Sequence, residues 1–245
     1  MVKHQKRKEE NMGLKIIAHR GFSDGYPENT LLAFKKAIEA DADDIETDLR
    51  LSLDGEIILF HDNDLSRLTT NDSKVEELTV MDLKKFDLGK GESIPKLDEL
   101  IALAQGKVTL ILEIKFYHKT YKQLCDILVE RIADKHDWIE VSCFDDRVLQ
   151  YLYHLDPDIR LHKLIKDRSV LEECGLEEKY AYVSYFDIHV SLSKMALKRG
   201  LMEKYKVILW TVDKEDISKE KNAGIYGIMV DNISKYIKET KAINE

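Results

Sequence analysis

Short apolar runs of strand length alternate with stretches of helical periodicity along most of the chain. This alternation is typical of repeated strand–helix units, whose strands build a parallel sheet. The strand-like runs cover residues 14–18, 44–48, 109–114, 138–143, 160–164, 182–185, 207–212 and 227–230. Eight such strands in a chain of 245 residues predict one α/β domain with the (β/α)8 TIM-barrel fold.

The stretches between these runs predict helices, because their apolar residues recur at helical spacing. The clearest covers 30–40, with Asn29 as its N-cap. The other predicted helices cover 98–104, 120–134, 145–154, 191–205, 214–222 and 233–240. This order of elements is that of a barrel whose helices cover its outer surface.

One segment departs from plain strand–helix alternation. The strand-like residues on either side of Asp54-Gly55 are separated by those two residues alone, and so short a turn joins antiparallel neighbours. We therefore expect residues 49–61 to form a hairpin that rises from the second strand and brings His61 back beside it. Residues of about 62–97 would follow as an insertion above the barrel mouth, with a short helix at 79–86.

The charge of the chain bears on its binding partners. A formal net charge of −8 argues against nucleic acid, which requires a basic surface. The basic cluster at residues 3–8 is interpreted as part of a flexible tail covering 1–12, ahead of a single domain at 13–245, with contact to anionic lipid as the alternative.

The chain has no apolar run long enough for an integral membrane segment and no apolar signal segment at its start. Its three cysteines have neither metal-binding nor redox-motif spacing. We therefore expect a cytoplasmic protein with reduced thiols.

Three carboxylates stand at the ends of predicted strands. Glu46 and Asp48 are two apart on one strand and point to the same face, and Glu113 ends the next strand of the barrel. Two carboxylates ~4 Å apart repel by roughly 4 kcal/mol at an effective dielectric of about 20, so three ionised together imply a cation. Oxygen ligands without cysteine select Mg²⁺ or Ca²⁺. Each acid alone would more often be solvated or paired in a salt bridge.

Two histidines accompany the acids. His19 ends the first strand and His61 ends the hairpin, so the two imidazoles are expected to flank a bound phosphate as an acid/base pair. A structural hydrogen bond is the alternative for each. That structural role is expected for the remaining histidines, such as His118, His136, His154, His162 and His189.

Arg20 and Lys115 are predicted to hold the phosphate oxygens. For Lys115 a salt bridge to Glu113 or Glu46 is the alternative, and both can hold at once. Glu28, at the start of the first helix, would bind a substrate hydroxyl or orient Arg20.

Aromatic residues at strand ends are predicted to lie on the same rim, where they would pack against a small alcohol group or serve only the core. They are Phe144, Tyr185, Phe186 and Trp210.

Five separated motifs occur in one order: His19-Arg20-Gly21, Pro27-Glu28-Asn29-Thr30, Glu46-Thr47-Asp48, His61-Asp62 and Glu113-Ile114-Lys115. In this order they resemble the pattern of the glycerophosphodiester phosphodiesterase family, and the resemblance runs from Ile16 to Asp231. It implies a TIM-barrel domain that uses a divalent cation to hydrolyse glycerophosphodiesters, small-molecule substrates, to glycerol 3-phosphate and an alcohol.

By the resemblance, Glu46, Asp48 and Glu113 correspond to metal ligands and His19 and His61 to the acid/base pair. Arg20 and Lys115 correspond to the phosphate contacts. In related phospholipases C a neighbouring hydroxyl attacks phosphorus, and a glycerol hydroxyl could do so here through a cyclic phosphate.

The chain departs from the family pattern at Asp41, where glycine is common, after Arg67, where a glycine is missing, and at Cys143. Loops on the substrate side are therefore expected to differ. Two other functions stay open: a lysophospholipase D or sphingomyelinase-like phosphodiesterase, and a non-catalytic barrel that binds phosphate or metal.

Overall fold

Eight parallel strands close a barrel in the computed structural model of this chain, which describes residues 13–213 and 223–237. The strands are β1 (Lys15–His19), β2 (Asp44–Leu51), β4 (Thr109–Ile114), β5 (Ile139–Cys143), β6 (Leu161–Ile165), β7 (Tyr185–His189), β8 (Lys206–Trp210) and β9 (Gly227–Val230). Pairing of β1 with both β2 and β9 closes the ring. The predicted fold class is confirmed.

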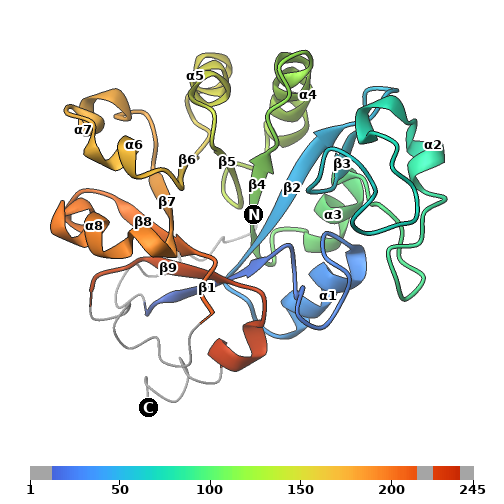
Figure 1. The fold of residues 1–245 in the computed structure, drawn as a ribbon, viewed down its shortest axis with the longest axis horizontal. Coiled ribbons are helices and arrows are strands. Elements are labelled where there is room, and N and C mark those ends of the chain that lie inside the picture. Colours follow the sequence, from blue (N-terminus) through green and yellow to red (C-terminus); the bar gives the residue numbers. More distant parts are fainter. Residues whose placement is uncertain (1–12, 214–222, 238–245) are drawn as a thin grey trace, which may run out of the picture.

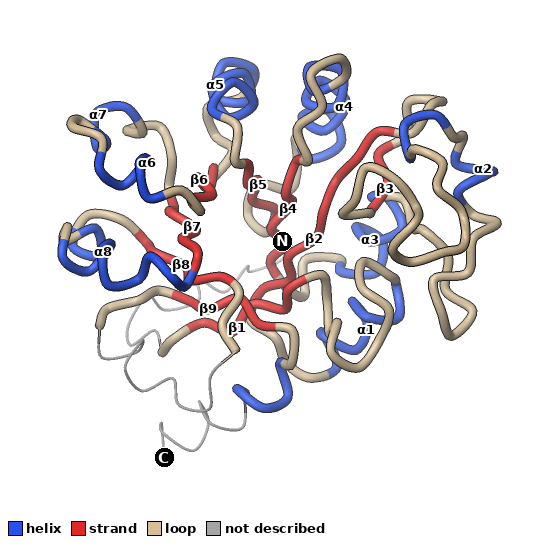
Figure 2. Tube along the Cα trace, viewed as in Figure 1, coloured by secondary structure: helices blue, strands red, loops and turns tan. Residues whose placement is uncertain are grey.

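Helices surround the strands, as Figures 1 and 2 show. They are α1 (Leu31–Glu39), α3 (Leu97–Ala104), α4 (Tyr121–Ile132), α5 (Asp146–Leu155), α6 (Arg168–Glu172), α7 (Leu176–Lys179) and α8 (Ser193–Lys198). Their apolar faces and the outward side chains of the strands form the main core, in which Phe34, Leu128 and Leu152 are fully buried. Within the described ranges, no helix has the length and apolar character needed to cross a membrane.

The predicted hairpin is present. Strand β3 (Ile57–Leu59) pairs antiparallel with the end of β2, Leu49 opposite Leu59. The connection is wider than the predicted two-residue turn: it spans residues 52–56, with Gly55 at a φ of 80°.

The segment after the hairpin lies beside the barrel, at the right of Figure 1. It holds a 3₁₀ turn (Val75–Glu77) and α2 (Val80–Leu83), which is shorter than the helix predicted at 79–86. A small core of its own fixes this segment to β3; its buried members are Ile58, Phe60, Leu65, Val75, Leu83 and Ile94.

Two predicted elements were wrong in their extent. The strand predicted at 182–185 lies later, at β7, because its inward-facing residues are polar and do not give the expected apolar run. The helix predicted at 191–205 is broken into 3₁₀ turns (Val190–Leu192 and Leu201–Glu203) on either side of α8. Gly200, at a φ of 72°, breaks it.

Helices α6 and α7 had no counterpart among the predicted elements. The predicted helix at 214–222 and the predicted tail at 1–12 lie outside the described residues, and the one at 233–240 is helical over its described part, 233–237.

Candidate active site

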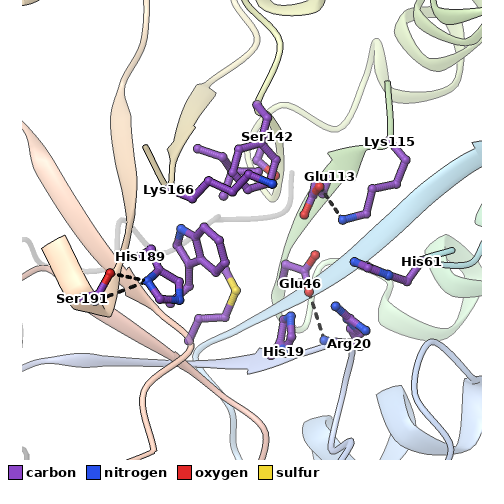
Figure 3. A pocket seen from close by; sticks show the side chains of 14 residues that line it. His19, Arg20, Glu46, His61, Glu113, Lys115, Ser142, Lys166, His189 and Ser191 are labelled. Carbon is purple, nitrogen blue, oxygen red and sulfur yellow. Dashed lines mark hydrogen bonds and ion pairs between the residues drawn. The ribbon is translucent and has the colours of Figure 1, made fainter. Parts of the chain in front are cut away.

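A cavity of about 500 Å³ opens at the carboxyl ends of the barrel strands (Figure 3). It is lined by His19, Arg20, Glu46, His61, Glu113, Lys115, Ser142, Phe144, Leu164, Lys166, His189, Ser191, Trp210 and Met229. Of the predicted metal ligands, catalytic histidines and polar substrate contacts, Asp48 and Glu28 are not part of this lining. Both of them contact Arg20, which lines the cavity.

The three predicted metal ligands come together. Glu46 and Asp48 are two residues apart on β2, so both side chains point into the barrel. Glu113 lies opposite Asp48 in the β2–β4 ladder. Each offers an oxygen within 4.8 Å of the others, and all three side chains are buried. Asn29 fixes Asp48 by donating a hydrogen bond of 2.7 Å from Nδ2 to Oδ2.

The charge state of this cluster fits a cation. Burial, together with Asp48, raises the pKa of Glu46 to about 8. Burial would also raise that of Asp48, but Lys115 and Arg20 outweigh it and hold the pKa well below its usual range. Among the described residues Oε1 of Glu46 is buried without a hydrogen-bond partner. An unpaired buried carboxylate oxygen within a set of hard oxygen donors suits Mg²⁺ or Ca²⁺.

Each predicted catalytic histidine is held by a carboxylate. Nδ1 of His19 lies 2.7 Å from Asp231 and Nδ1 of His61 lies 2.7 Å from Asp62. A carboxylate on Nδ1 fixes the ring and leaves Nε2 to exchange a proton.

The pKa values of these two imidazoles move in opposite directions. Burial disfavours the charged form of His19, but the hydrogen bond that its Nδ1 donates to Asp231 outweighs burial and raises the pKa. Burial lowers the pKa of His61, and the cations Lys115 and Arg20 lower it further. Titratable groups pushed apart in this way are suited to opposite proton-transfer roles.

The His-Arg-Gly sequence makes the sharp bend that follows β1. Arg20 and Gly21 have φ values of 57° and 79°. A side chain at Gly21 would lie 2.8 Å from the backbone carbon of Ala33, so only glycine fits against α1. The bend also directs the Arg20 N–H to Glu46, at 3.0 Å from Oε2.

Both predicted phosphate-binding cations lie between carboxylates. Lys115 Nζ is 2.8 Å from Asp48 and 2.5 Å from Glu113. The Arg20 guanidinium lies 2.8 Å from Glu28 and 3.3 Å from Asp48. The ion pair predicted as an alternative for Lys115 therefore forms with Glu113 and not with Glu46.

Of the two roles predicted for Glu28, its position fits the orientation of Arg20, since Glu28 forms ion pairs with Arg20 and with Arg67. The predicted N-cap was one residue too early: Thr30 caps α1, while Asn29 has a φ of 55° and turns its side chain to β2.

The aromatic prediction holds for two residues of four. Phe144 and Trp210 line the cavity edge to face, with ring centroids 5.5 Å apart. Tyr185 lies deeper in the barrel, stacked on His162, and Phe186 is buried in the outer core. Both misplacements follow from the shifted position of β7.

Several cavity residues were not singled out as site residues. Ser142 lies on β5, Lys166 directly follows β6, and His189 ends β7 with Ser191 beyond it. His189 was given only a structural role. The correct position of β7 would have put it at the reactive end of the barrel.

Comparison with known proteins identifies the family to which this chain belongs. The model of the glycerophosphoryl diester phosphodiesterase family matches residues 19–235. The chain belongs to this family. It is thus an enzyme of the phosphoric diester hydrolase class, as the sequence motifs implied.

A glycerophosphodiester phosphodiesterase of Caldanaerobacter subterraneus is 32% identical over 238 residues, which cover 89% of this chain and 93% of the relative. A phosphodiesterase of Oleispira antarctica, solved with its product sn-glycerol-3-phosphate, superposes with a TM-score of 0.82 at 26% identity, covering 94% and 97% of the two chains. A family member from Thermotoga maritima gives 0.78 at 26% identity, covering 94% and 99%.

Proposed function

We propose that this enzyme hydrolyses glycerophosphodiesters to glycerol 3-phosphate and an alcohol, with a divalent cation and two imidazoles. The observation that carries the proposal is a buried cluster of three carboxylates in one cavity with two carboxylate-held histidines. The product bound in the Oleispira antarctica relative supports the substrate class.

The acidic cluster and the cations divide the binding task. Glu46, Asp48 and Glu113 would hold Mg²⁺ or Ca²⁺. When bound, the cation supplies positive charge beside the phosphate oxygens, where negative charge develops during displacement. Arg20 and Lys115 contact the remaining phosphate oxygens, and the carboxylates around them keep both side chains extended toward the cavity.

The histidines carry the protons. His61, whose pKa is lowered, takes the proton of the attacking hydroxyl, from water or from the substrate's glycerol. A new P–O bond forms while the bond to the departing alcohol breaks. His19, whose pKa is raised, gives its Nε2 proton to the departing oxygen. With glycerol as the attacking group, water then opens the cyclic phosphate with the two roles reversed.

Release of glycerol 3-phosphate from glycerophosphoglycerol in the presence of Mg²⁺ or Ca²⁺ tests the proposal. We expect activity that chelator abolishes and that His19→Ala lowers at least ~100-fold. Unchanged activity in either control would contradict the mechanism. Absence of turnover on every glycerophosphodiester tried would contradict the function itself.

A further inference from the structure

The cavity has one half that the proposed chemistry does not use. We call it the aromatic half; its members are Phe144, Leu164, Lys166, His189, Ser191 and Trp210. All the carboxylates of the cavity lining, as far as the chain is described, belong to the metal cluster and not to this half.

Lys166 is the cation of this half, and it differs from the other cations of the cavity. Within residues 13–213 and 223–237 its ammonium group has no ion pair or hydrogen bond, whereas Arg20 and Lys115 each lie between two carboxylates. Its Nζ stands 5.1 Å from the centroid of the Phe144 ring. Figure 3 shows Lys166 extending over the cavity on the side of Ser142. Its positive charge is therefore available to a ligand.

His189 adds a second donor. Its Nδ1 accepts from the backbone N–H of Ser191 at 3.4 Å and lies 2.8 Å from the Ser191 hydroxyl. Since Nδ1 is the acceptor, the neutral ring carries its proton on Nε2. That Nε2 has no hydrogen-bond partner in the described parts of the chain, and the ring packs edge to face on Trp210 at 4.9 Å.

A second cavity, of about 330 Å³, meets the first at His19 and Arg20. Its other lining residues are Ser23, Asp24, Glu28 and Asp231. Their carboxylate and hydroxyl oxygens accept hydrogen bonds, as the hydroxyl groups of a glycerol arm require. A phosphodiester bound at Arg20 has two organic arms, so the aromatic half is left for the alcohol.

An aromatic wall alone would suit a quaternary ammonium such as choline. Here the face of Phe144 is already covered by the ammonium of Lys166, and a second cation would meet it at close range without a carboxylate to offset the repulsion. A phosphate, a carboxylate or a set of hydroxyl groups would instead accept from Lys166 and from Nε2 of His189.

Building on the proposed function, we infer that the aromatic half selects diesters whose alcohol is anionic or rich in hydroxyl groups and disfavours those with a cationic alcohol. Lys166 is the residue that determines this specificity. His189 and the two aromatic rings set the position of the alcohol beside it.

The test compares kcat/KM for glycerophosphoinositol 4-phosphate, glycerophosphoinositol and glycerophosphocholine. We expect that order of preference in the unmodified enzyme. In Lys166→Gln the ratio of kcat/KM for the phosphorylated substrate over the choline substrate should fall about tenfold, and in Lys166→Glu it should fall further, because the charge is reversed. Lys166 is exposed, so neither change disturbs the core.

Lys107→Gln is the matched control. Lys107 is also exposed, but it precedes β4 at the end of the barrel away from the cavity, so its loss should leave the ratio unchanged. Turnover of these diesters with a ratio that Lys166→Gln does not move, or with choline preferred, would overturn the inference while leaving the proposed function intact. Turnover of none would overturn both.

Discussion

At the scale of single residues, the environment of Glu46 in the absence of a cation disfavours its ionised form. It is buried with two further carboxylates, its pKa is raised to about 8, and one of its oxygens lacks a hydrogen-bond partner among the described residues. A buried group of this kind is typical of functional sites, so we expect that replacing Glu46 lowers activity but not stability.

We expect Glu46→Gln to lower activity at least ~100-fold, since a metal ligand contributes more than its supporting shell. It should also stabilise the cation-free protein. Glu46 stays protonated in the fold up to a pKa near 8 but ionises in the unfolded chain near the ordinary glutamate pKa of 4.5, so unfolding becomes easier as pH rises through this window. Glutamine does not titrate.

Denaturant unfolding in chelator at pH 5 and pH 8 measures this effect. The variant should gain about 2 kcal/mol or more over the unmodified protein at pH 8 and much less at pH 5. The exposed Glu39→Gln serves as control and should change neither stability nor activity. Equal gains at both pH values would refute the assigned ionisation of Glu46.

Which residues of the candidate site could be predicted from the sequence depends on whether each residue lies in a local sequence pattern. Acids two apart on a strand and a histidine at a strand end leave a local pattern, so Glu46, Asp48 and His19 could be found from sequence. Asp231, which holds His19, lies 212 residues away and leaves no such pattern. Lys166 is a lone lysine after a strand, and only the closed barrel brings it to the cavity.

At the scale of elements, the insertion is connected to the barrel through Arg67. Its guanidinium donates to both oxygens of Glu28, at 2.8 and 2.7 Å, and to Asp62 at 2.5 Å. Glu28 holds Arg20 and Asp62 holds His61. One exposed side chain thus contacts the carboxylates that hold both Arg20, the proposed phosphate contact, and His61, the proposed proton carrier.

Replacing Arg67 by glutamine should reduce kcat/KM about tenfold with little change in stability, because the side chain is 44% exposed. Without the guanidinium, Asp62 places more negative charge on His61 and its pKa rises. The acidic limb of the kcat/KM profile should therefore move to higher pH. Arg67→Lys, which keeps the charge but not the fork, should restore part of the loss.

Arg147 provides the matched control, since it is similarly exposed and, among the described residues, its ion-pair partner is Asp145. Arg147→Gln should leave the pH profile in place. A loss of activity in Arg67→Gln with no displacement of the acidic limb would mean that Arg67 supports the fold and does not position His61.

Elements were predictable where a local pattern marks them, such as apolar residues at regular spacing, a conventional cap or the Glu46-Thr47-Asp48 motif of β2. The hairpin could be predicted from Asp54-Gly55, although hydrogen bonds of Ser52 widen the turn. Strand β7 could not be predicted correctly because Asp187 and His189 point into the barrel, where periodicity leads one to expect apolar side chains. Short helices such as α6 have too few residues to show a period.

At the scale of the whole molecule, a network of ionisable side chains lies inside the barrel, near the amino ends of β5, β6 and β7. His162, fully buried, lies 3.0 Å from Asp187 through Nδ1 and 2.9 Å from Glu140 through Nε2. Arg160 and the Tyr185 hydroxyl also reach Glu140. Both imidazole nitrogens have a carboxylate partner, which favours the protonated ring.

This network should make stability depend on pH. Burial opposes the charge on His162, but Asp187 and Glu140 outweigh it and raise the pKa to about 9. Because this pKa exceeds the ordinary histidine pKa of 6.5, the stabilisation is fully present below pH 6.5 and is lost as pH rises through 9.

We expect His162→Gln to destabilise the protein by about 3–5 kcal/mol at pH 6 and by ~3 kcal/mol less near pH 9.5, measured by denaturant unfolding. His154→Gln, on the exposed face of α5, should show neither effect. A destabilisation that is constant across this range would mean that His162 is neutral in the fold.

The central proposal is one arrangement: an acidic cluster that would hold a cation, with an imidazole on either side of the position proposed for the phosphate. A crystal structure with Mn²⁺ and glycerol 3-phosphate, the ion located by its anomalous signal, tests it most directly. We expect the ion on Glu46, Asp48 and Glu113, with phosphate oxygens at Arg20 and Lys115 and Nε2 of both His19 and His61 facing the phosphate. An ion bound away from these carboxylates, or a phosphate out of reach of either imidazole, would contradict the account.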